Sequence, residues 1–239
     1  MPLQDIEDIN NHTSNPDLFK IYSQIILELL EWITNYNKDE TKQKSLFANT
    51  LNQLERKKYK ENNNLIIRKN VLINVLRKML IIKDIVYTDN NRKYIDTLKI
   101  LLQKKPSRSL SGIASITVLT SPHPHGQTFS CKHNCYYCPN EPAHEGNDFQ
   151  EQPRSYLYNE PAVRRANQHK FLAIDQTRNR LDTLFMNGHE IDKLEFILEG
   201  GTYTEYPPAY FEEYHRDLFY TANTYFDDKP RREPLSIAE

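Results

Sequence analysis

Residues 130–139 read SCKHNCYYCP and hold every cysteine of the chain, Cys131, Cys135 and Cys138. Three thiols at the spacing C-x3-C-x2-C, with Tyr137 directly before the third, can bind three irons of a [4Fe-4S] cluster and leave the fourth iron without a protein ligand. An open iron is a reaction site. The stretch therefore predicts a fold that presents a reactive loop.

The same arrangement is typical of the radical S-adenosylmethionine (SAM) signature, in which the open iron binds the amino and carboxylate groups of SAM. The cofactor then carries the chemistry and the protein orients it. Two other interpretations stay open at this point. Three cysteines with His133 and His144 nearby also suit a closed, structural Cys3His zinc site, and three thiols in one loop can be unrelated.

Length and composition set the general class of the protein. With 239 residues, 38% of them apolar and 11% aromatic, the chain has room for one or two domains with a core. The odd number of cysteines and the polar N-terminus, which has no apolar signal region, argue against a disulfide framework and predict a cytoplasmic, reducing location. No apolar run approaches the roughly 18 residues that cross a bilayer, so no membrane anchor is expected.

The formal net charge of −1 hides an uneven distribution along the chain. Residues 53–108 carry 15 Lys and Arg against 5 Asp and Glu, whereas the segments on both sides are net acidic. A basic block of this size indicates a surface suited to a polyanion such as nucleic acid. Solvated helix faces are the plainer explanation.

The first hundred residues predict helices. Residues 1–14 are polar and are expected to form a disordered lead. Asn15, Pro16 and Asp17 indicate a helix start, and apolar residues then recur every three or four positions to about Tyr36. A loop is expected over 37–44, a shorter helix around Leu46–Leu54, and further helices over 65–82 and 92–103. Residues 15–104 are thus predicted to form an all-helical domain with a basic surface; the family resemblance described below implies that this domain binds tRNA.

The character of the sequence changes at residue 105. The Pro106 region marks a boundary, and 113–119 predicts a buried strand that leads directly into the cysteine loop. A long helix over 161–187, ended by Gly188, and a second strand over 194–198 follow. Chemistry in parallel α/β folds lies at the carboxyl ends of strands, where both the cysteine loop and Gly200-Gly201-Thr202 are placed. The predicted fold class is α/β.

Motifs over residues 105–226 resemble the catalytic third subunit of Elongator. They are, in order, KPSRSLSGIA at 105–114, CYYCP at 135–139, SY at 155–156, EP at 160–161, RA at 165–166, QTR at 176–178, GH at 188–189, DK at 192–193 and EFILEGGT at 195–202. The resemblance implies a tRNA-modifying enzyme that uses radical-SAM chemistry and acetyl-CoA to form a carboxymethyl group on C5 of the wobble uridine. Its partners would be tRNA and Elongator-like subunits.

Residue roles also follow from the resemblance. Cys131, Cys135 and Cys138 would bind the [4Fe-4S] cluster, Tyr137 would lie beside SAM, and Gly200, Gly201 and Thr202 would contact its methionine part. The candidates for tRNA phosphate contacts are Lys104, Lys105, Arg108 and Arg165, for each of which plain surface solvation is the alternative.

The sequence departs from the family in two ways. Many members place the first cysteine farther upstream, at the position of His125, whereas Cys131 has the spacing general to radical-SAM enzymes. Residues 105–239 also offer only about two strand–helix units of a partial TIM barrel and no acetyltransferase domain. We therefore expect an incomplete radical-SAM domain over 105–239: a fragment, a truncated gene product, or one half that needs a separate C-terminal half. A tRNA-binding module without chemistry and a zinc-stabilised interaction protein remain alternatives.

Overall fold

The computed structural model describes residues 3–36, 40–61 and 65–227, and the chain divides into two compact units. The first comprises residues 1–112 with 182–191, and the second comprises 113–181 with 192–239. The tRNA-binding and radical-SAM assignments of the two predicted domains stay predictions.

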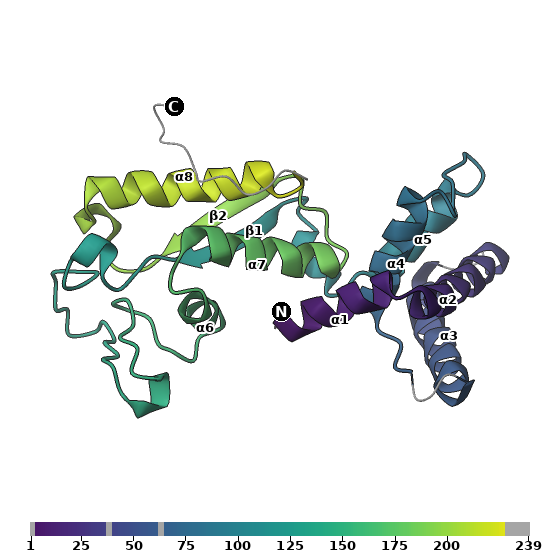
Figure 1. Cartoon of the computed structure of the whole chain (residues 1–239), viewed down its shortest axis with the longest axis horizontal. Coiled ribbons are helices and arrows are strands. Elements are labelled where there is room, and N and C mark those ends of the chain that lie inside the picture. Colours follow the sequence, from purple (N-terminus) through teal and green to yellow (C-terminus); the bar gives the residue numbers. More distant parts are fainter. Residues whose placement is uncertain (1–2, 37–39, 62–64, 228–239) are drawn as a thin grey trace. The chain divides into compact units, whose positions relative to one another are not determined.

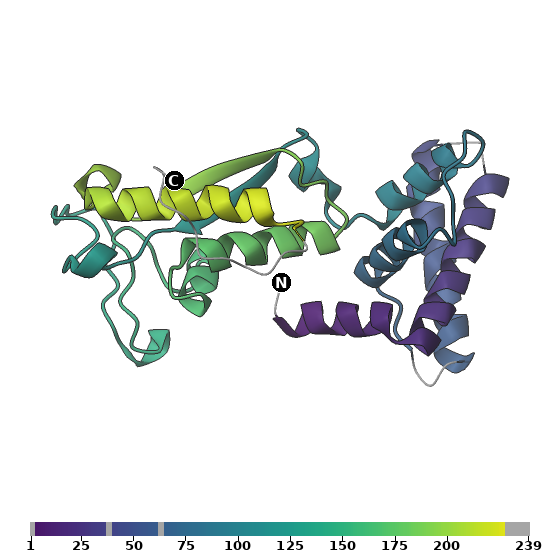
Figure 2. The same cartoon turned by 45° about the horizontal axis from the view of Figure 1, so that its top comes forward.

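The first unit is helical (Figures 1 and 2). Its helices are α1 (Leu3–Ser14), α2 (Pro16–Asn35), α3 (Glu40–Glu61), α4 (Lys69–Ile81) and α5 (Arg92–Leu102), followed by a 3-10 helix at Pro106–Ser109. One apolar core joins these helices, and among the described residues α4 contributes more buried side chains to it than any other helix does. The predicted start of α2 is confirmed, because the Asn15 side chain accepts hydrogen bonds from the backbone N–H groups of Asp17 and Leu18.

Three predictions for this unit are wrong in detail. The expected disordered lead is helix α1, whose Ile9 is buried in the core. The expected loop over 37–44 is helical from Glu40, and α3 is a long helix that continues to Glu61; residues 37–39 lie outside the described part. Helix α4 begins only at Lys69. Among the α1 side chains that the structure describes, residues 9–14, the buried apolar one is Ile9, and its contact with the core cannot be read from the local sequence.

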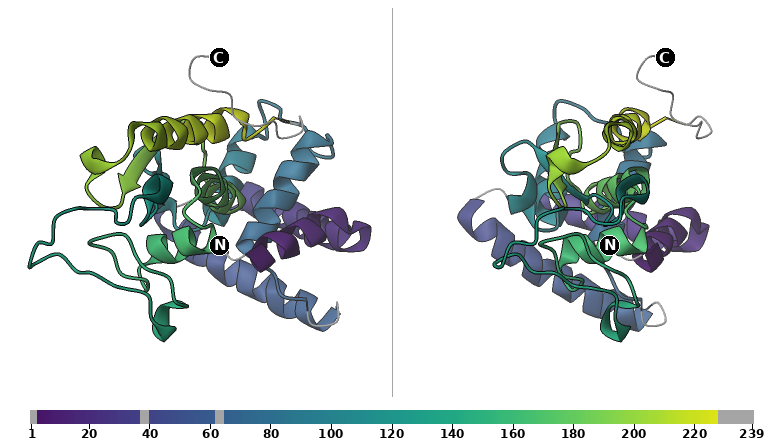
Figure 3. Two further views of the ribbon diagram at one scale, coloured as in Figure 1. Left: turned by 60° about the vertical axis from the view of Figure 1, so that its left-hand side comes forward. Right: turned by 90° about the vertical axis from the view of Figure 1, so that its left-hand side faces the viewer.

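The second unit contains a small parallel sheet. Strands β1 (Ala114–Leu119) and β2 (Leu194–Glu199) pair in parallel from Ala114 opposite Leu194 to Leu119 opposite Glu199. The other elements are α6 (Pro161–Gln168), α8 (Pro208–Thr224) and 3-10 helices at Pro124–Gly126, Glu145–Asn147 and Tyr203–Glu205; α7 (Ala173–Met186) begins in this unit. The segment between β1 and α6, which carries the cysteines, has little regular structure (Figures 1 and 3).

The two faces of the sheet differ in burial. Ala114, Ile116 and Val118 alternate along β1 and are fully buried, and Phe196 on the same face meets Phe219 of α8 with ring centroids 6.5 Å apart. On the opposite face of β2, Glu195 and Ile197 are exposed. Helix α8 therefore packs on this face, which accounts for the apolar alternation in β1, and on the opposite face Leu119 at the end of β1 is buried in a cluster with Phe171.

The predicted long helix over 161–187 is interrupted. Helix α6 ends at Gln168 and α7 begins at Ala173, and between them Lys170 and Phe171 adopt left-handed φ angles of 49° and 58°. The Phe171 N–H donates to the Ala166 carbonyl, and its ring packs on Leu119. Burial of this ring explains why the helix breaks here. The predicted end of α7 is confirmed: Gly188 has φ 89°, and Gly188 and His189 donate back to the last turn in a Schellman motif.

The architecture is helix-rich with a two-strand parallel sheet, consistent with the α/β class. The incomplete TIM barrel stays an expectation. Among the described residues, no helix has the length and apolar character needed to cross a membrane.

Candidate functional site at the cysteine loop

The three cysteines lie on the irregular segment that follows β1. All three are free thiols and partly exposed. Cys135 and Cys138 share a turn in which the Cys138 N–H donates to the Cys135 carbonyl at 3.1 Å. Tyr136 and Tyr137 in this turn are 105% and 86% exposed. The loop thus presents its thiols and two aromatic rings at the surface of the second unit.

Ser130 anchors the start of this loop. It is only 3% exposed, and its carbonyl accepts a hydrogen bond from the Thr202 N–H at 3.1 Å. Its hydroxyl accepts a second hydrogen bond from the Arg154 N–H at 2.8 Å. The Arg154 guanidinium in turn donates to the Asn134 side chain between the first two cysteines. Residues that are distant in the sequence therefore hold the loop on both sides.

Gly200 and Gly201 allow this close approach. A Cβ on Gly201 would lie 2.0 Å from the Ser130 carbonyl oxygen, and one on Gly200 would lie 1.9 Å from the Thr120 hydroxyl. Gly200 also has a φ of 148°, which side-chain-bearing residues rarely adopt. The glycine pair is thus explained by packing of the protein against itself. The predicted contact of Gly200, Gly201 and Thr202 with SAM stays a prediction.

The Cys131 thiol meets the segment after β2. Its sulfur lies 2.8 Å from the Thr202 hydroxyl and accepts the His133 N–H at 3.4 Å. Burial acts to raise the pKa of Cys131, but these hydrogen bonds and the nearby Arg154 charge outweigh it and lower that pKa below its ordinary value. The site therefore makes the thiolate, which is the form that binds metals, easier to reach than in an ordinary cysteine.

Tyr137 lies against the thiol of the second cysteine. A hydrogen bond to Cys135, together with the charge that Cys135 would carry, raises the pKa of the Tyr137 hydroxyl. The raised pKa favours the protonated phenol. This contact places Tyr137 beside a predicted cluster ligand, and its predicted position beside SAM stays untested.

The donor set suits an iron–sulfur cluster in kind, since it consists of three free thiols with one poised toward the thiolate. In the part of the chain that the structure describes, no three Cys, His, Asp or Glu side chains are already gathered as a metal site. His144, a component of the zinc alternative, bonds to Glu141 at 3.1 Å and caps the turn at Gly146. The cysteines would therefore have to close around a metal as it binds.

Three tyrosines of α8 and the turn before it secure the carboxyl end of β1. The Tyr206 hydroxyl lies 2.7 Å from that of Thr120, the Tyr210 hydroxyl accepts the Ser121 N–H at 2.8 Å, and Tyr214 donates to the Leu119 carbonyl at 2.8 Å. Burial raises the pKa of all three phenols, so they remain protonated at neutral pH. The strand end that leads into the loop is therefore rigidly hydrogen-bonded.

Side chains also occupy the other edge of β1. The Gln176 amide pairs with both the N–H and the carbonyl of Leu119, at 3.0 and 2.9 Å. The Arg165 guanidinium donates to the Thr117 carbonyl, and burial lowers its pKa. Arg165 thus has a structural role at the sheet edge, and its predicted contact with a tRNA phosphate stays a prediction.

The other three predicted RNA contacts lie in the first unit. Lys104, Lys105 and Arg108 are all exposed, around the 3-10 helix that follows α5. Lys105 has a left-handed φ of 55°. They form a group of accessible positive charges, and nothing in the structure tests whether they bind RNA.

Sequence reasoning missed Ser130, Arg154, Thr120 and Tyr206. None of them belongs to a metal-binding or nucleotide-binding motif, and each makes its hydrogen bond with a residue that is distant in the sequence. Only the placement of Ser130 directly before the first cysteine could have drawn attention to it.

Fold and site together define a parallel β–α–β unit with a three-cysteine loop after its first strand, tied to a Gly-Gly-Thr turn after its second. No family model matches the chain. Elongator complex protein 3 of Dictyostelium discoideum is 38% identical over 125 residues, which are 52% of this chain and 22% of that protein. The Homo sapiens protein is 36% identical over 126 residues, which are 53% of this chain and 22% of that protein. The Saccharomyces cerevisiae protein is 36% identical over 113 residues, which are 47% of this chain and 20% of that protein.

These relatives confirm the predicted resemblance: the chain is similar to a part of Elongator complex protein 3. The matching region spans about a fifth of the length of these relatives.

Proposed function

We propose that this chain carries the cluster-binding part of a tRNA-modifying enzyme of the Elongator subunit 3 type. One observation supports the proposal above the others. The free cysteines at C-x3-C-x2-C spacing follow a parallel strand, and the first of them, Cys131, is hydrogen-bonded to Thr202 of the turn after the neighbouring strand. Two strand ends therefore meet where a ligand-binding site of an α/β fold is expected.

The residues divide into ligands and positioning groups. Cys131, Cys135 and Cys138 would bind a [4Fe-4S] cluster, which when bound supplies the electron for reductive cleavage of SAM. Thr202 orients the Cys131 sulfur, and Ser130 holds the loop against the turn. The Tyr137 hydroxyl lies beside Cys135 and would be close to a bound cluster.

The substrate side of the proposal rests on the family resemblance of the sequence motifs. The base modified would be the tRNA wobble uridine, and acetyl-CoA would supply the carboxymethyl carbons. A separate acetyltransferase part and Elongator-like subunits would be partners, in the cytoplasm. The exposed charges of Lys104, Lys105 and Arg108 offer tRNA phosphates a docking surface.

Anaerobic reconstitution with iron and sulfide tests the proposal. We expect about four irons per chain, and 5′-deoxyadenosine after addition of dithionite and SAM. Cys135→Ala should lose both, whereas Asn140→Ala, an exposed change just beyond the loop, should keep both. Zinc in place of iron would favour the zinc-stabilised protein, and salt-sensitive tRNA binding without any metal would favour a non-catalytic binding module.

A further inference from the structure

Arg154 and Ser155 are hydrogen-bonded to the cysteine loop beside each of its three cysteines. The Arg154 N–H donates at 2.8 Å to the hydroxyl of Ser130, which directly precedes the first cysteine. The Arg154 guanidinium donates to the side chain of Asn134, which directly precedes the second. The Ser155 N–H donates at 3.1 Å to the carbonyl of Pro139, which directly follows the third. The Arg154 side chain is therefore held at the cysteine loop.

The Arg154 guanidinium has no negatively charged partner. Within the described ranges no carboxylate forms an ion pair with it, whereas the lysine of the loop, Lys132, pairs with Glu205 at 2.8 Å. The Arg154 Nε is buried, and no described group accepts its hydrogen. A buried donor without an acceptor is unfavourable, so it is expected to meet a ligand or to serve one. Arg154 thus holds an unused positive charge and an unused N–H group at the loop.

An anion that fits this charge is the one that the three cysteines would bind. Thiolate ligands make an iron–sulfur cluster site anionic, and reduction of the cluster adds a further negative charge. Positive charges and N–H donors near the sulfurs stabilise the reduced form more than the oxidised form, so they raise the reduction potential. The same charge already acts on a ligand, because with the hydrogen bonds of Cys131 it outweighs burial and lowers the pKa of that thiol.

We infer that Arg154 supplies the positive charge and a hydrogen-bond donor for an anionic cluster on Cys131, Cys135 and Cys138, and that this charge makes the cluster easier to reduce. The inference rests on the proposed function, because it needs a cluster at these cysteines. It goes beyond that function in assigning to Arg154, a residue of no metal-binding motif, the control of the reduction potential.

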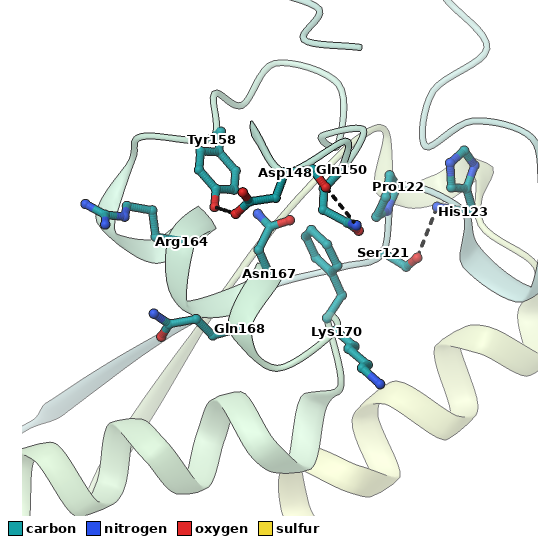
Figure 4. A pocket seen from close by; sticks show the side chains of 11 residues that line it. Ser121, Pro122, His123, Asp148, Gln150, Tyr158, Arg164, Asn167, Gln168 and Lys170 are labelled. Carbon is teal, nitrogen blue, oxygen red and sulfur yellow. Dashed lines mark hydrogen bonds between the residues drawn. The ribbon is translucent and has the colours of Figure 1, made fainter. Parts of the chain in front are cut away.

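Arg164 offers a matched control in the same unit. It lies on α6 at the wall of a cavity, and its guanidinium points away from the other residues drawn in Figure 4. Arg164 is exposed, and none of the described residues that line this cavity belongs to the cysteine loop, 130–140. Salt screens interactions of solvent-exposed charges. Loss of the Arg164 charge should therefore leave the potential of a cluster on the cysteines unchanged.

Redox titration of the reconstituted chain tests the inference. Wild type, Arg154→Gln, Arg154→Lys and Arg164→Gln are loaded anaerobically with iron and sulfide. The electron paramagnetic resonance signal of the reduced cluster is then followed against potential, with dithionite as the electron donor. Arg154→Gln keeps an N–H donor for Asn134 but loses the charge, so reduction should become at least about tenfold less favourable, a shift of about 59 mV to more negative potential for one electron. Arg154→Lys should keep most of the wild-type potential, and Arg164→Gln should match wild type.

The iron content of each variant separates the charge of Arg154 from its hydrogen bonds. An unchanged potential in Arg154→Gln at wild-type iron content would overturn the inference and leave the proposed function intact. Equal loss of iron in Arg154→Gln and Arg154→Lys would also overturn it, because the geometry of the guanidinium, and not its charge, would then hold the loop. Loss of iron in Arg154→Gln that Arg154→Lys restores would support it. Wild type that takes up no iron would refute the proposed function and this inference with it.

Discussion

Ser130 shows how a residue outside any motif positions a site. Its carbonyl and hydroxyl bind the backbone N–H groups of Thr202 and Arg154, and its carbonyl occupies the space that a side chain on Gly201 would need. The Gly-Gly pair is thus part of the loop's anchor. A substitution at Gly201 should therefore displace the cysteine loop, and any loss of ligand binding would follow from that displacement.

We expect Gly201→Ala to lower the free energy of unfolding by about 1–3 kcal/mol, because its Cβ would meet the Ser130 backbone and force a shift. Urea denaturation measures this change, and reconstituted iron should fall with it. Gly126→Ala is the matched control. It has φ 79° with open space around it, so it should cost only the conformational strain of about 1–2 kcal/mol and leave iron binding unchanged. Equal iron loss in both variants would contradict the steric explanation.

Glu199, at the end of β2, should make stability depend on pH. Burial and the neighbouring Glu160 raise its pKa above the ordinary value of 4.5, although Arg165 opposes the shift. A raised pKa means that the folded state keeps the proton longer. The stabilisation by this group is therefore complete below the ordinary pKa and is lost as the pH rises through the folded-state value.

Glu199→Gln lacks this titration. The stability of the variant relative to wild type should therefore increase between about pH 4 and pH 7. Urea denaturation at several pH values measures the free energy of unfolding of the variant and of wild type. The contributions of the other carboxylates are the same in both proteins and cancel in the difference. Glu195→Gln, an exposed change on the same strand, serves as control. A relative stability that falls with rising pH would show that Arg165 outweighs burial.

At the outer edge of β1, side chains from two helices occupy the hydrogen-bonding positions that a neighbouring strand would take. The outer edge of β1 would expose backbone groups, and Gln176 of α7 and Arg165 of α6 bind them instead. Unpaired edges invite association with other chains. The two helices between the paired strands therefore secure the edge as well as connect the sheet.

Gln176→Leu should destabilise the chain more than Tyr214→Phe does. Leu119 is fully buried, and loss of Gln176 leaves its N–H without a partner at a cost of about 1–3 kcal/mol. After Tyr214→Phe the Leu119 carbonyl still accepts from Gln176, so the cost should be only about 1 kcal/mol. Urea denaturation ranks the two variants. The opposite order would mean that the tyrosine, and not the glutamine, secures the edge.

Over the whole chain, charge is divided between segments. Residues 53–108 carry 15 positive and 5 negative side chains within a chain of net charge −1. Part of this charge is used internally, since Lys58 is buried and pairs with Glu28 and Glu61. Lys104, Lys105 and Arg108 remain exposed. These three cations are the clearest candidates for RNA phosphates.

Replacement of Lys104, Lys105 and Arg108 by Ala should weaken tRNA binding. The fall of the logarithm of the association constant with the logarithm of salt concentration should also become less steep, by about 2 in slope, since each phosphate contact contributes about 0.7–0.9. Anisotropy titrations at several salt concentrations measure the slope. Lys20→Ala, an exposed lysine outside the basic block, should leave it unchanged. An unaltered slope in the triple variant would exclude these residues as phosphate contacts.

Features of this protein that depend on near neighbours along the chain could be predicted from its amino-acid sequence. The cysteine spacing, the start of α2 at Asn15, the two strands and the Gly188 helix end each follow from residues within a few positions of one another. The break between α6 and α7, where Phe171 is buried in a cluster with Leu119, and the packing of α1 through Ile9 depend on tertiary contacts that the sequence pattern did not reveal. The partners of the site, such as Cys131 with Thr202, depend on such contacts as well. Helix starts, helix ends and strands depend on residues close together in the sequence, so local patterns reveal them. These contacts join segments that are far apart along the chain, and no periodicity in the sequence marks such pairs.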